Sequence, residues 1–288
     1  TIDISGVAIK SGNAVILRGG SEAINSNKTI AEILRESIKD YINKEVIQII
    51  ENTDRSIVDR MVKLNGYLDL LIPRGSASFI EYVRKNATVP IIETGAGNNH
   101  IYVNNDADLD MATRIIINAK VQRPAVCNAA RKVLIHKDIA EKYLPKLISE
   151  LKKYGVIIKG DQKVVKIIQD VVLATEEDWD KEYMDLTLAI KIVDSVQEAV
   201  EHINKHGTKH SEAIITNSLK DAQYFTQNVD AACTYVNASI RFTDGEQFGF
   251  GAEVGISTQK LHARGPMGIK ELTTTKYVIF GEGQTREI

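Results

Sequence analysis

Cys127 stands in a segment whose residue types suit covalent chemistry. It follows closely after Arg123 and Pro124, and Pro124 favours an extended conformation for the residue before it. A nearby cation such as Arg123 would favour the thiolate, which is the nucleophilic form of cysteine. A single cysteine is more often a small buried hydrophobic residue, so the segment alone leaves both interpretations open. Cys233 lies in an apolar, strand-like run and is predicted to belong to the core.

Gly95, Gly97 and His100 occur in a pattern that begins like a dinucleotide-binding fingerprint. His100 stands where the third glycine would be, and no acidic residue follows at the right distance. A tight backbone turn beside a site is the favoured interpretation, because glycine permits the close approach of another group.

Three histidines, His202, His206 and His210, are spaced four residues apart. On one unbroken helix their imidazoles would share a face, but Gly207 predicts that the helix ends between them. No cysteine or carboxylate completes a ligand set, so we expect a solvated helix end and no metal.

Short β-rich runs alternate with polar helical stretches around these residues. Strands separated by long helical crossovers imply right-handed connections and a parallel sheet. Strands are predicted at 13–18, 46–50, 68–72, 89–93, 132–136, 234–237 and 273–280, and within 182–193 and 211–228. Helices are predicted at 21–41, 76–85, 106–120, 138–154 and 196–205, after residue 53 or 54, and within 211–228. We therefore expect two α/β lobes in close contact, with the last strand at an edge or exchanged.

The composition excludes several classes of protein. The 288 residues suffice for about two domains, and the 36 basic and 38 acidic residues nearly cancel, which argues against nucleic acid as the main partner. Two cysteines cannot build a disulfide framework and fit a reducing compartment. No apolar run is long enough for a membrane span, and the first residues do not form a signal peptide. Because Thr1 is not a natural start, we expect that residues precede it or that the chain was cut.

Several long segments of the chain match one family, in that family's order. Residues 122–129 resemble its nucleophile segment, 11–23 its cofactor strand and 92–98 its glutamate-glycine turn. The other matching segments are 174–179, 182–186, 235–239, 241–245 and 248–268. The sequence therefore resembles the gamma-glutamyl phosphate reductases, the proline-pathway members of the aldehyde dehydrogenase superfamily, over nearly its whole length.

The resemblance implies an α/β fold of the aldehyde dehydrogenase type. A Rossmann-type parallel-sheet cofactor domain would cover 1–93, an α/β catalytic domain 94–268, and a C-terminal segment with an oligomerisation strand 269–288. The N-terminal part of a full-length family member, which carries an asparagine that donates to the oxyanion, has no counterpart here.

The resemblance also implies a reaction, the NADPH-dependent reduction of L-glutamate 5-phosphate to L-glutamate 5-semialdehyde and phosphate in L-proline biosynthesis. Cys127 would carry the acyl group as a thioester. Glu93 occupies the position of the superfamily's general base, and either handles a proton or positions the turn. We expect a cytoplasmic homo-oligomer, a dimer or higher, that acts on a small molecule and binds neither nucleic acid nor membrane.

Charged and helix-capping residues are assigned to the two ligands by the same resemblance. For NADPH these are Arg18 at the 2′-phosphate, Ser21 and Glu22 at the adenosine ribose, Gly75 and Ser76 at the pyrophosphate, and Glu182 at the nicotinamide ribose. For the anionic ends of the substrate they are Arg123, Arg241, His262 and Arg264, and for its ammonium group Asp244 or Glu253. A surface position for Arg18 and ordinary helix caps at Ser21 and Ser76 are the alternatives.

Asn99, Ala130 and Arg131 depart from the family pattern, which more often has an acidic residue after the alanines. Arg131 either adds positive potential near the thiolate or faces solvent.

Two other functions stay open, a coenzyme A-acylating aldehyde dehydrogenase and a truncated chain that folds without catalysis. The arginine and histidine of 248–268 argue against the first of these.

Overall fold

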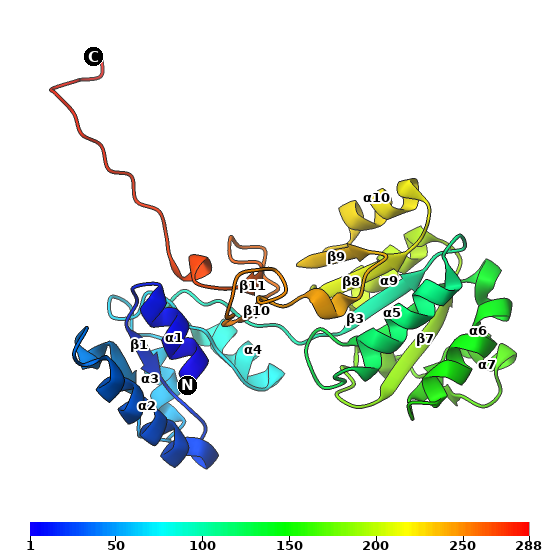
Figure 1. Ribbon diagram of the computed structural model, residues 1–288, viewed down its shortest axis with the longest axis horizontal. Coiled ribbons are helices and arrows are strands. Elements are labelled where there is room, and N and C mark those ends of the chain that lie inside the picture. The colour runs from blue at the N-terminus through cyan, green and yellow to red at the C-terminus, as the bar shows by residue number, and fades with distance from the viewer. Residues whose placement is uncertain (288) are drawn as a thin grey trace.

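The protein forms two α/β lobes with a small antiparallel hairpin between them (Figure 1). The computed structural model describes residues 1–287. The hairpin consists of β10 (Gly255–Ser257) and β11 (Gly265–Met267). Among the described residues, no helix combines the length and the apolar character that crossing a lipid bilayer requires.

A short pair of parallel strands organises the smaller, N-terminal lobe. β1 (Val15–Leu17) pairs with β2 (Ile47–Ile49), which confirms the strands predicted there, although both are shorter than expected. The helices of this lobe are α1 (Ile2–Lys10), α2 (Ile24–Ile38), α3 (Ser56–Met61) and α4 (Ala77–Asn86), with 3₁₀ turns η1 (Ser21–Ala23) and η2 (Lys44–Val46). The helix predicted from residue 21 therefore begins as a 3₁₀ turn.

The strands predicted at 68–72 and 89–93 are wrong. One parallel bridge joins Leu71 to Ile91, and the Leu71 N–H donates to the Pro90 carbonyl at 2.9 Å. Pro90 has no N–H of its own, so it cannot extend a ladder in the other direction. The two segments are extended but do not form a sheet.

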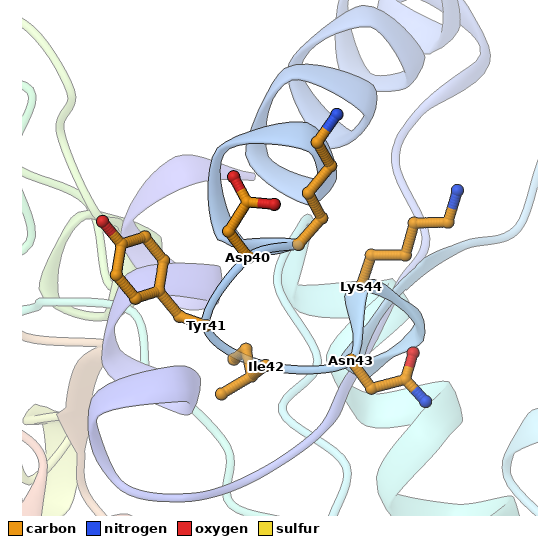
Figure 2. A pocket seen from close by; sticks show the side chains of 6 residues that line it. Asp40, Tyr41, Ile42, Asn43 and Lys44 are labelled. Carbon is orange, nitrogen blue, oxygen red and sulfur yellow. The ribbon is translucent and has the colours of Figure 1, made fainter.

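A hollow of about 620 Å³ lies at the turn 39–44, which follows α2. Figure 2 shows the side chains of this turn splayed outward instead of converging on one point, and Tyr41 is 87% exposed. A ligand site needs convergent polar groups in a concave setting. The hollow is therefore not a candidate functional site.

A parallel sheet of seven strands dominates the larger lobe, in the order β6-β5-β7-β4-β3-β8-β9. The strands are β3 (Asn99–Val103), β4 (Ala130–His136), β5 (Ile157–Gly160), β6 (Val172–Leu173), β7 (Thr187–Val193), β8 (Ser211–Ile215) and β9 (Cys233–Val236). The parallel arrangement predicted from the strand–helix alternation is confirmed.

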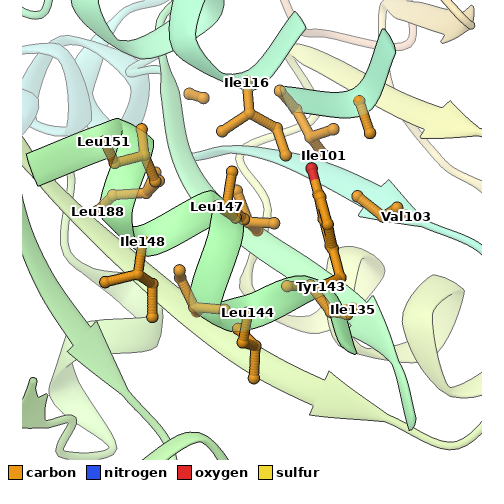
Figure 3. Packing of buried hydrophobic residues seen from close by; sticks show 14 of the residues in the cluster. Ile101, Val103, Ile116, Ile135, Tyr143, Leu144, Leu147, Ile148, Leu151 and Leu188 are labelled. Atoms are coloured by element: carbon orange, nitrogen blue, oxygen red, sulfur yellow. The ribbon is translucent and has the colours of Figure 1, made fainter. Parts of the chain in front are cut away.

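Helices cover both faces of this sheet. Helices α5 (Leu109–Val121), α6 (Lys137–Lys152) and α7 (Gln162–Ile167) contribute to one core, and α9 (Val196–His206) and α10 (Leu219–Asn228) contribute to the other. Ile101 and Val103 pack into the first core beside Tyr143 and Leu147 (Figure 3), whereas Tyr102 packs into the second. Burial on both faces explains why the central strands read as nearly continuous apolar runs.

The predicted strands do not include β3, although it lies inside the sheet. Its first residues, Asn99 and His100, are polar and follow a glycine turn, which disguises the strand. Both side chains are fully buried, and hydrogen bonds to distant parts of the chain satisfy their polar atoms in part. Such partners do not show in a local pattern.

The strand predicted at 273–280 does not form in the single chain. Residues 273–287 have no regular secondary structure, and this segment extends away from both lobes in Figure 1. Tyr277, Ile279 and Phe280 are 90%, 88% and 94% exposed. A strand requires a hydrogen-bonded neighbour, and the described part of the chain provides none at this place.

Candidate active site

Cys127 lies at the amino edge of the large sheet. It is half-buried in residues 122–129, here called the nucleophile loop, which connect α5 to β4. The glycine turn at 95–98 precedes β3, and Glu182 precedes β7. Ligands of open parallel sheets usually bind at the carboxyl ends of the strands. Here the loops that enter the strands gather the reactive side chains instead.

Gly97 touches the nucleophile loop directly. A Cβ atom added to Gly97 would lie 1.5 Å from the Cys127 carbonyl oxygen, a separation that no side chain can adopt. The Gly97 N–H donates to Glu182 Oε1 at 2.8 Å. The close approach predicted for this glycine is confirmed, because only a residue without a Cβ fits against the loop.

Two buried side chains hold the backbone of the nucleophile loop. Asn99 Nδ2 donates to the carbonyls of Cys127 at 2.7 Å and of Ala129 at 2.8 Å. The Arg131 guanidinium donates to the carbonyls of Pro124 and Val126, at 2.8 Å each. Asn99 and Arg131 are 0% exposed, which excludes the solvent-facing alternative for Arg131.

The charges around the thiol come from both lobes and from the hairpin region. Burial raises the pKa of Cys127, and the carboxylates of Glu253 and Glu182 raise it further. The Cys127 backbone N–H and Arg74 act in the opposite direction. Arg74 belongs to the smaller lobe and donates to the Val254 carbonyl. The cation expected to favour the thiolate was Arg123, but its side chain is exposed, and Arg74 is the cation that lowers the pKa.

The two carboxylates near Cys127 are held differently. Glu182 Oε1 lies 3.6 Å from Arg131 Nη2, in addition to its bond from Gly97. Glu253 Oε2 accepts from the Gly245 N–H at 2.8 Å, and burial raises its pKa. Glu182 is thus paired with a buried cation, whereas Glu253 has no ion-pair partner among residues 1–287.

The four cations assigned to the substrate do not form one group. Arg241 Nε donates to Gln122 Oε1 at 3.0 Å, and both the Cys127 sulfur and Arg123 influence its pKa, which burial lowers. Arg264 Nη2 instead donates to Asp230 Oδ1 at 2.8 Å, where Lys209 and Lys260 also bind. His262 is exposed. Of the four, Arg241 is therefore the one that interacts with the thiol, and Arg123 lies near Arg241.

Glu93 is linked to the hairpin region through its backbone. Its N–H donates to Gln259 Oε1 at 3.0 Å, and the next residue, Thr94, pairs with Ser257. Within residues 1–287 the Glu93 carboxylate accepts no hydrogen bond. These contacts favour the positioning alternative for Glu93 over proton handling.

The residues assigned to the cofactor are divided between the lobes: Arg18, Ser21 and Glu22 follow β1, Gly75 and Ser76 precede α4, and Glu182 lies in the larger lobe before β7. Arg18 follows β1, and its Nη2 donates to the Thr53 carbonyl at 3.2 Å, while the buried Nε has no hydrogen-bond partner in the described chain. The Ser76 hydroxyl accepts from the Phe79 N–H at 3.3 Å and so caps α4. A partly satisfied guanidinium directly after β1 fits a phosphate group, whereas the hydrogen bond of Ser76 agrees with the alternative of an ordinary helix cap.

His202 and His206 share helix α9, whereas His210 lies outside it. The predicted solvated helix end is wrong, because His202 and His210 are 5% and 0% exposed. Helix α9 ends at His206 with Gly207 as its C-cap, as predicted, and His210 lies beyond the helix, directly before β8. His206 Nδ1 lies 2.7 Å from Asp180 Oδ1. Among residues 1–287 no group of three or more His, Cys, Asp or Glu side chains is arranged to hold a metal ion.

Comparison with known proteins assigns this arrangement to a family. The family model described as "Aldehyde dehydrogenase family" matches residues 4–167. The "Gamma-glutamyl phosphate reductase" of Clostridium botulinum (strain Eklund 17B / Type B) is 61% identical over 287 residues, covering 99% of this chain and 69% of that protein. The crystal structure of gamma-glutamyl phosphate reductase from Thermotoga maritima superposes with a TM-score of 0.97 at 54% identity, covering 99% of this chain and 69% of that one.

The chain belongs to the gamma-glutamyl phosphate reductase family. This membership makes it an oxidoreductase of the aldehyde dehydrogenase type. An acetylating aldehyde dehydrogenase from Geobacillus thermoglucosidasius shares the fold, with a TM-score of 0.75 and 19% identity, covering 98% of this chain and 72% of that one.

Within this reductase family fold, the sequence did not identify two neighbours of the thiol. Arg74 lies directly before the predicted Gly75 and Ser76, in a segment interpreted only as a phosphate-binding helix start. Asn99 departs from the family pattern, and the sequence assigns it no role. Neither residue carries a local signal, because the contacts that define it join segments far apart in the chain.

Proposed function

We propose that this protein reduces L-glutamate 5-phosphate to L-glutamate 5-semialdehyde and phosphate with NADPH, as a cytoplasmic enzyme of L-proline biosynthesis. The observation that carries the proposal is the 61% identity, over 99% of the chain, to a protein named gamma-glutamyl phosphate reductase. The half-buried thiol of Cys127, whose pKa responds to Arg74 of the smaller lobe and to Glu182 of the larger lobe, supports it.

In the proposed reaction the Cys127 thiolate attacks the acyl carbon of the substrate. The new C–S bond forms as the bond from the acyl carbon to the phosphate oxygen breaks, and phosphate leaves with the electron pair. The Cys127 N–H donates to no carbonyl in residues 1–287, so it is free to stabilise the tetrahedral oxyanion. When bound, the reduced nicotinamide supplies hydride to the thioester carbon. Breaking the C–S bond then releases the aldehyde and restores the Cys127 thiolate.

The charged groups near the thiol suit the ends of this substrate. Arg123 and Arg241 are proposed to bind its phosphate, since Arg241 interacts with the Cys127 sulfur and Arg123 lies near Arg241. Glu253 is proposed to bind the α-ammonium group, because its carboxylate faces the thiol without a cation of its own. Asp244, the alternative for the ammonium, accepts from the Glu246 and Gln247 N–H groups.

His262 and Arg264 remain predicted substrate residues. Arg264 would have to leave its ion pair with Asp230 to reach the substrate. Water attack on the thioester would waste the intermediate as glutamate, so a base at Glu93 is not required. We propose that Glu93 positions the turn through Gln259.

The cofactor is proposed to lie along the carboxyl edge of the smaller lobe's strands. Arg18 would pair with the 2′-phosphate, which favours NADPH over NADH. Ser21 and Glu22 would meet the adenosine ribose, Gly75 and Ser76 the pyrophosphate, and Glu182 the nicotinamide ribose. On this basis residues 1–93 form the cofactor domain and 94–268 the catalytic domain.

We also propose that the protein works as a homo-oligomer through residues 269–288. The side chains of Tyr277, Ile279 and Phe280 are almost fully exposed in the single chain, which supports burial against a second copy. Light scattering on the complete protein tests this, and a strict monomer would contradict it.

The reverse reaction provides the decisive assay for the activity. Glutamate semialdehyde, inorganic phosphate and NADP⁺ should yield NADPH with the purified protein and not with Cys127→Ser. Reduction of NADP⁺ that needs coenzyme A instead of phosphate would overturn the proposal in favour of a coenzyme A-acylating enzyme. Absence of both activities in a folded sample would favour a non-catalytic chain.

A further inference from the structure

We propose that Asn99 and Arg131 are positioning residues that together hold the nucleophile loop and set the reactivity of its thiol. The inference rests on the proposed function for the role of Cys127. The sequence resemblance assigns neither residue a role.

Hydrogen bonds from Asn99 and Arg131 are spread along the nucleophile loop. Four of its carbonyls, those of Pro124, Val126, Cys127 and Ala129, accept from these two side chains at 2.7 to 2.8 Å. Donation to the carbonyl of the cysteine and to carbonyls on both sides of it leaves its backbone little freedom to rotate. The direction of the thiol is therefore decided by two residues that do not touch the substrate.

The supports of the two side chains are themselves rigid. Asn99 begins β3 and Arg131 lies in β4, and these strands are paired neighbours in the sheet. The Asn99 Oδ1 accepts from the Ser211 N–H at 3.3 Å, which fixes the orientation of the amide. Positioning residues on strands are more precise than residues on loops.

Arg131 also controls a charge that opposes thiolate formation. Glu182 raises the pKa of Cys127, and Arg131 lies 3.6 Å from that carboxylate. The Cys127 sulfur in turn favours the charged form of Arg131. Replacing Arg131 by a neutral residue would remove a cation and leave Glu182 unpaired, and both changes disfavour the thiolate.

The remaining charged groups near Arg131 come from the neighbouring elements. Lys120 of α5 is 0% exposed, and burial together with Arg131 lowers its pKa to about 7. His210, before β8, is buried, and burial and Arg131 lower its pKa to about 4. Asp185 favours the charged form of Arg131. The thiol itself also faces Glu253, Arg74 and Arg241.

The test measures thiol reactivity and loop order in a Cys233→Ser background, where Cys127 is the remaining cysteine. Iodoacetamide alkylation from pH 6 to 10 gives the titration midpoint, and hydrogen exchange reports on the Val126 and Ala129 amides, which bond within the loop. Arg131→Gln should raise the midpoint by about one pH unit. Arg131→Lys keeps the charge and should leave the midpoint near that of the parent.

Hydrogen exchange distinguishes the loss of the loop's hydrogen bonds from the loss of the Arg131 charge. Arg131→Gln, Arg131→Lys and Asn99→Ala should each speed exchange of the loop amides by about tenfold or more, because each removes loop hydrogen bonds. Lys159→Gln is the matched control, since Lys159 pairs with Asp178 at 2.7 Å on β5 and does not contact the loop. It should change neither readout.

An unchanged midpoint in Arg131→Gln together with unchanged loop exchange in Asn99→Ala would overturn the proposal. If Arg131→Gln does not fold, Arg131→Lys and Asn99→Ala still test it by exchange. The phosphate-dependent assay on the parent is scored separately. A parent without reductase activity, but with the expected loop effects, would refute the function and leave the positioning role standing.

Discussion

Cys127 and Cys233 share several properties and still occupy very different regions. Both are half-buried free thiols, and burial raises the pKa of both. Both lie at the amino edge of the same sheet, one before β4 and the other at the start of β9. Exposure and pKa direction alone would not distinguish a nucleophile from a core residue.

The two cysteines differ in the hydrogen bonds that their backbone groups make. Cys233 belongs to a strand, its N–H donates to the His210 carbonyl at 3.0 Å, and its sulfur lies near Thr243 and Tyr235. Cys127 belongs to a loop whose carbonyls are held from outside while its own N–H stays free. A reactive thiol needs a fixed backbone with an unused donor, and only the second region combines both.

Exchanging sulfur for oxygen at the two positions gives the largest expected contrast. Cys127→Ser should lower the rate of phosphate-dependent NADP⁺ reduction by about 10⁴-fold or more, as for other lost nucleophiles. Cys233→Ser should retain activity within a few-fold, because its sulfur takes no part in the reaction. Appreciable turnover by Cys127→Ser, with its thermal unfolding unchanged, would eliminate the thioester.

Gly97→Ala tests how closely the nucleophile region is packed. A Cβ placed 1.5 Å from the Cys127 carbonyl forces the turn and the loop apart. We expect a loss of about 3 kcal/mol of unfolding free energy, typical of strong overpacking, and little activity. Gly6→Ala is the control, since a Cβ there meets nothing within 4 Å. Equal denaturation midpoints for the two variants would refute the close contact.

Arg18→Ala extends the comparison to the smaller lobe. Removing the guanidinium should raise the KM for NADPH by about tenfold or more, because a charge-assisted bond to the 2′-phosphate is lost. The KM for NADH should change much less, and kcat should stay similar. Steady-state kinetics with both cofactors measure the difference, and equal losses would remove Arg18 from the phosphate site.

Low pH should destabilise the larger lobe through its buried histidines, and this is the smallest of the expected effects. Burial lowers the pKa of His202 to about 3 and of His210 to about 4. The unfolded chain, with ordinary histidines near pH 6.5, then binds more protons, so stability falls as pH drops from about 6.5 towards 4. His202→Gln should flatten this dependence of the melting temperature, and an unchanged slope would contradict it.

Local patterns predicted much of the architecture. Helix α9 ends at Gly207 because of its cap, α4 begins at the Ser76 cap, and the alternation of strands and helices predicts the parallel sheet. Local patterns gave wrong predictions where a strand begins with polar residues or where a strand-like segment has no neighbouring strand. β3 begins with the buried Asn99 and His100, and the apolar run at 273–280 has no neighbouring strand in the described chain.

The sequence by itself predicted the family, the close backbone contact at Gly97 and the choice of Cys127 as the candidate nucleophile. Motif order and backbone freedom are properties of short segments, so they can be read from the sequence. Only the tertiary structure decided that Arg131 is buried, that Asn99 and Arg131 bind the loop carbonyls, and that Arg74 is a cation that lowers the pKa of the thiol. The physical reason is the parallel sheet. It brings the amino ends of strands far apart in the chain to one edge, and side-chain partners there depend on strand order, which no local stretch of sequence encodes.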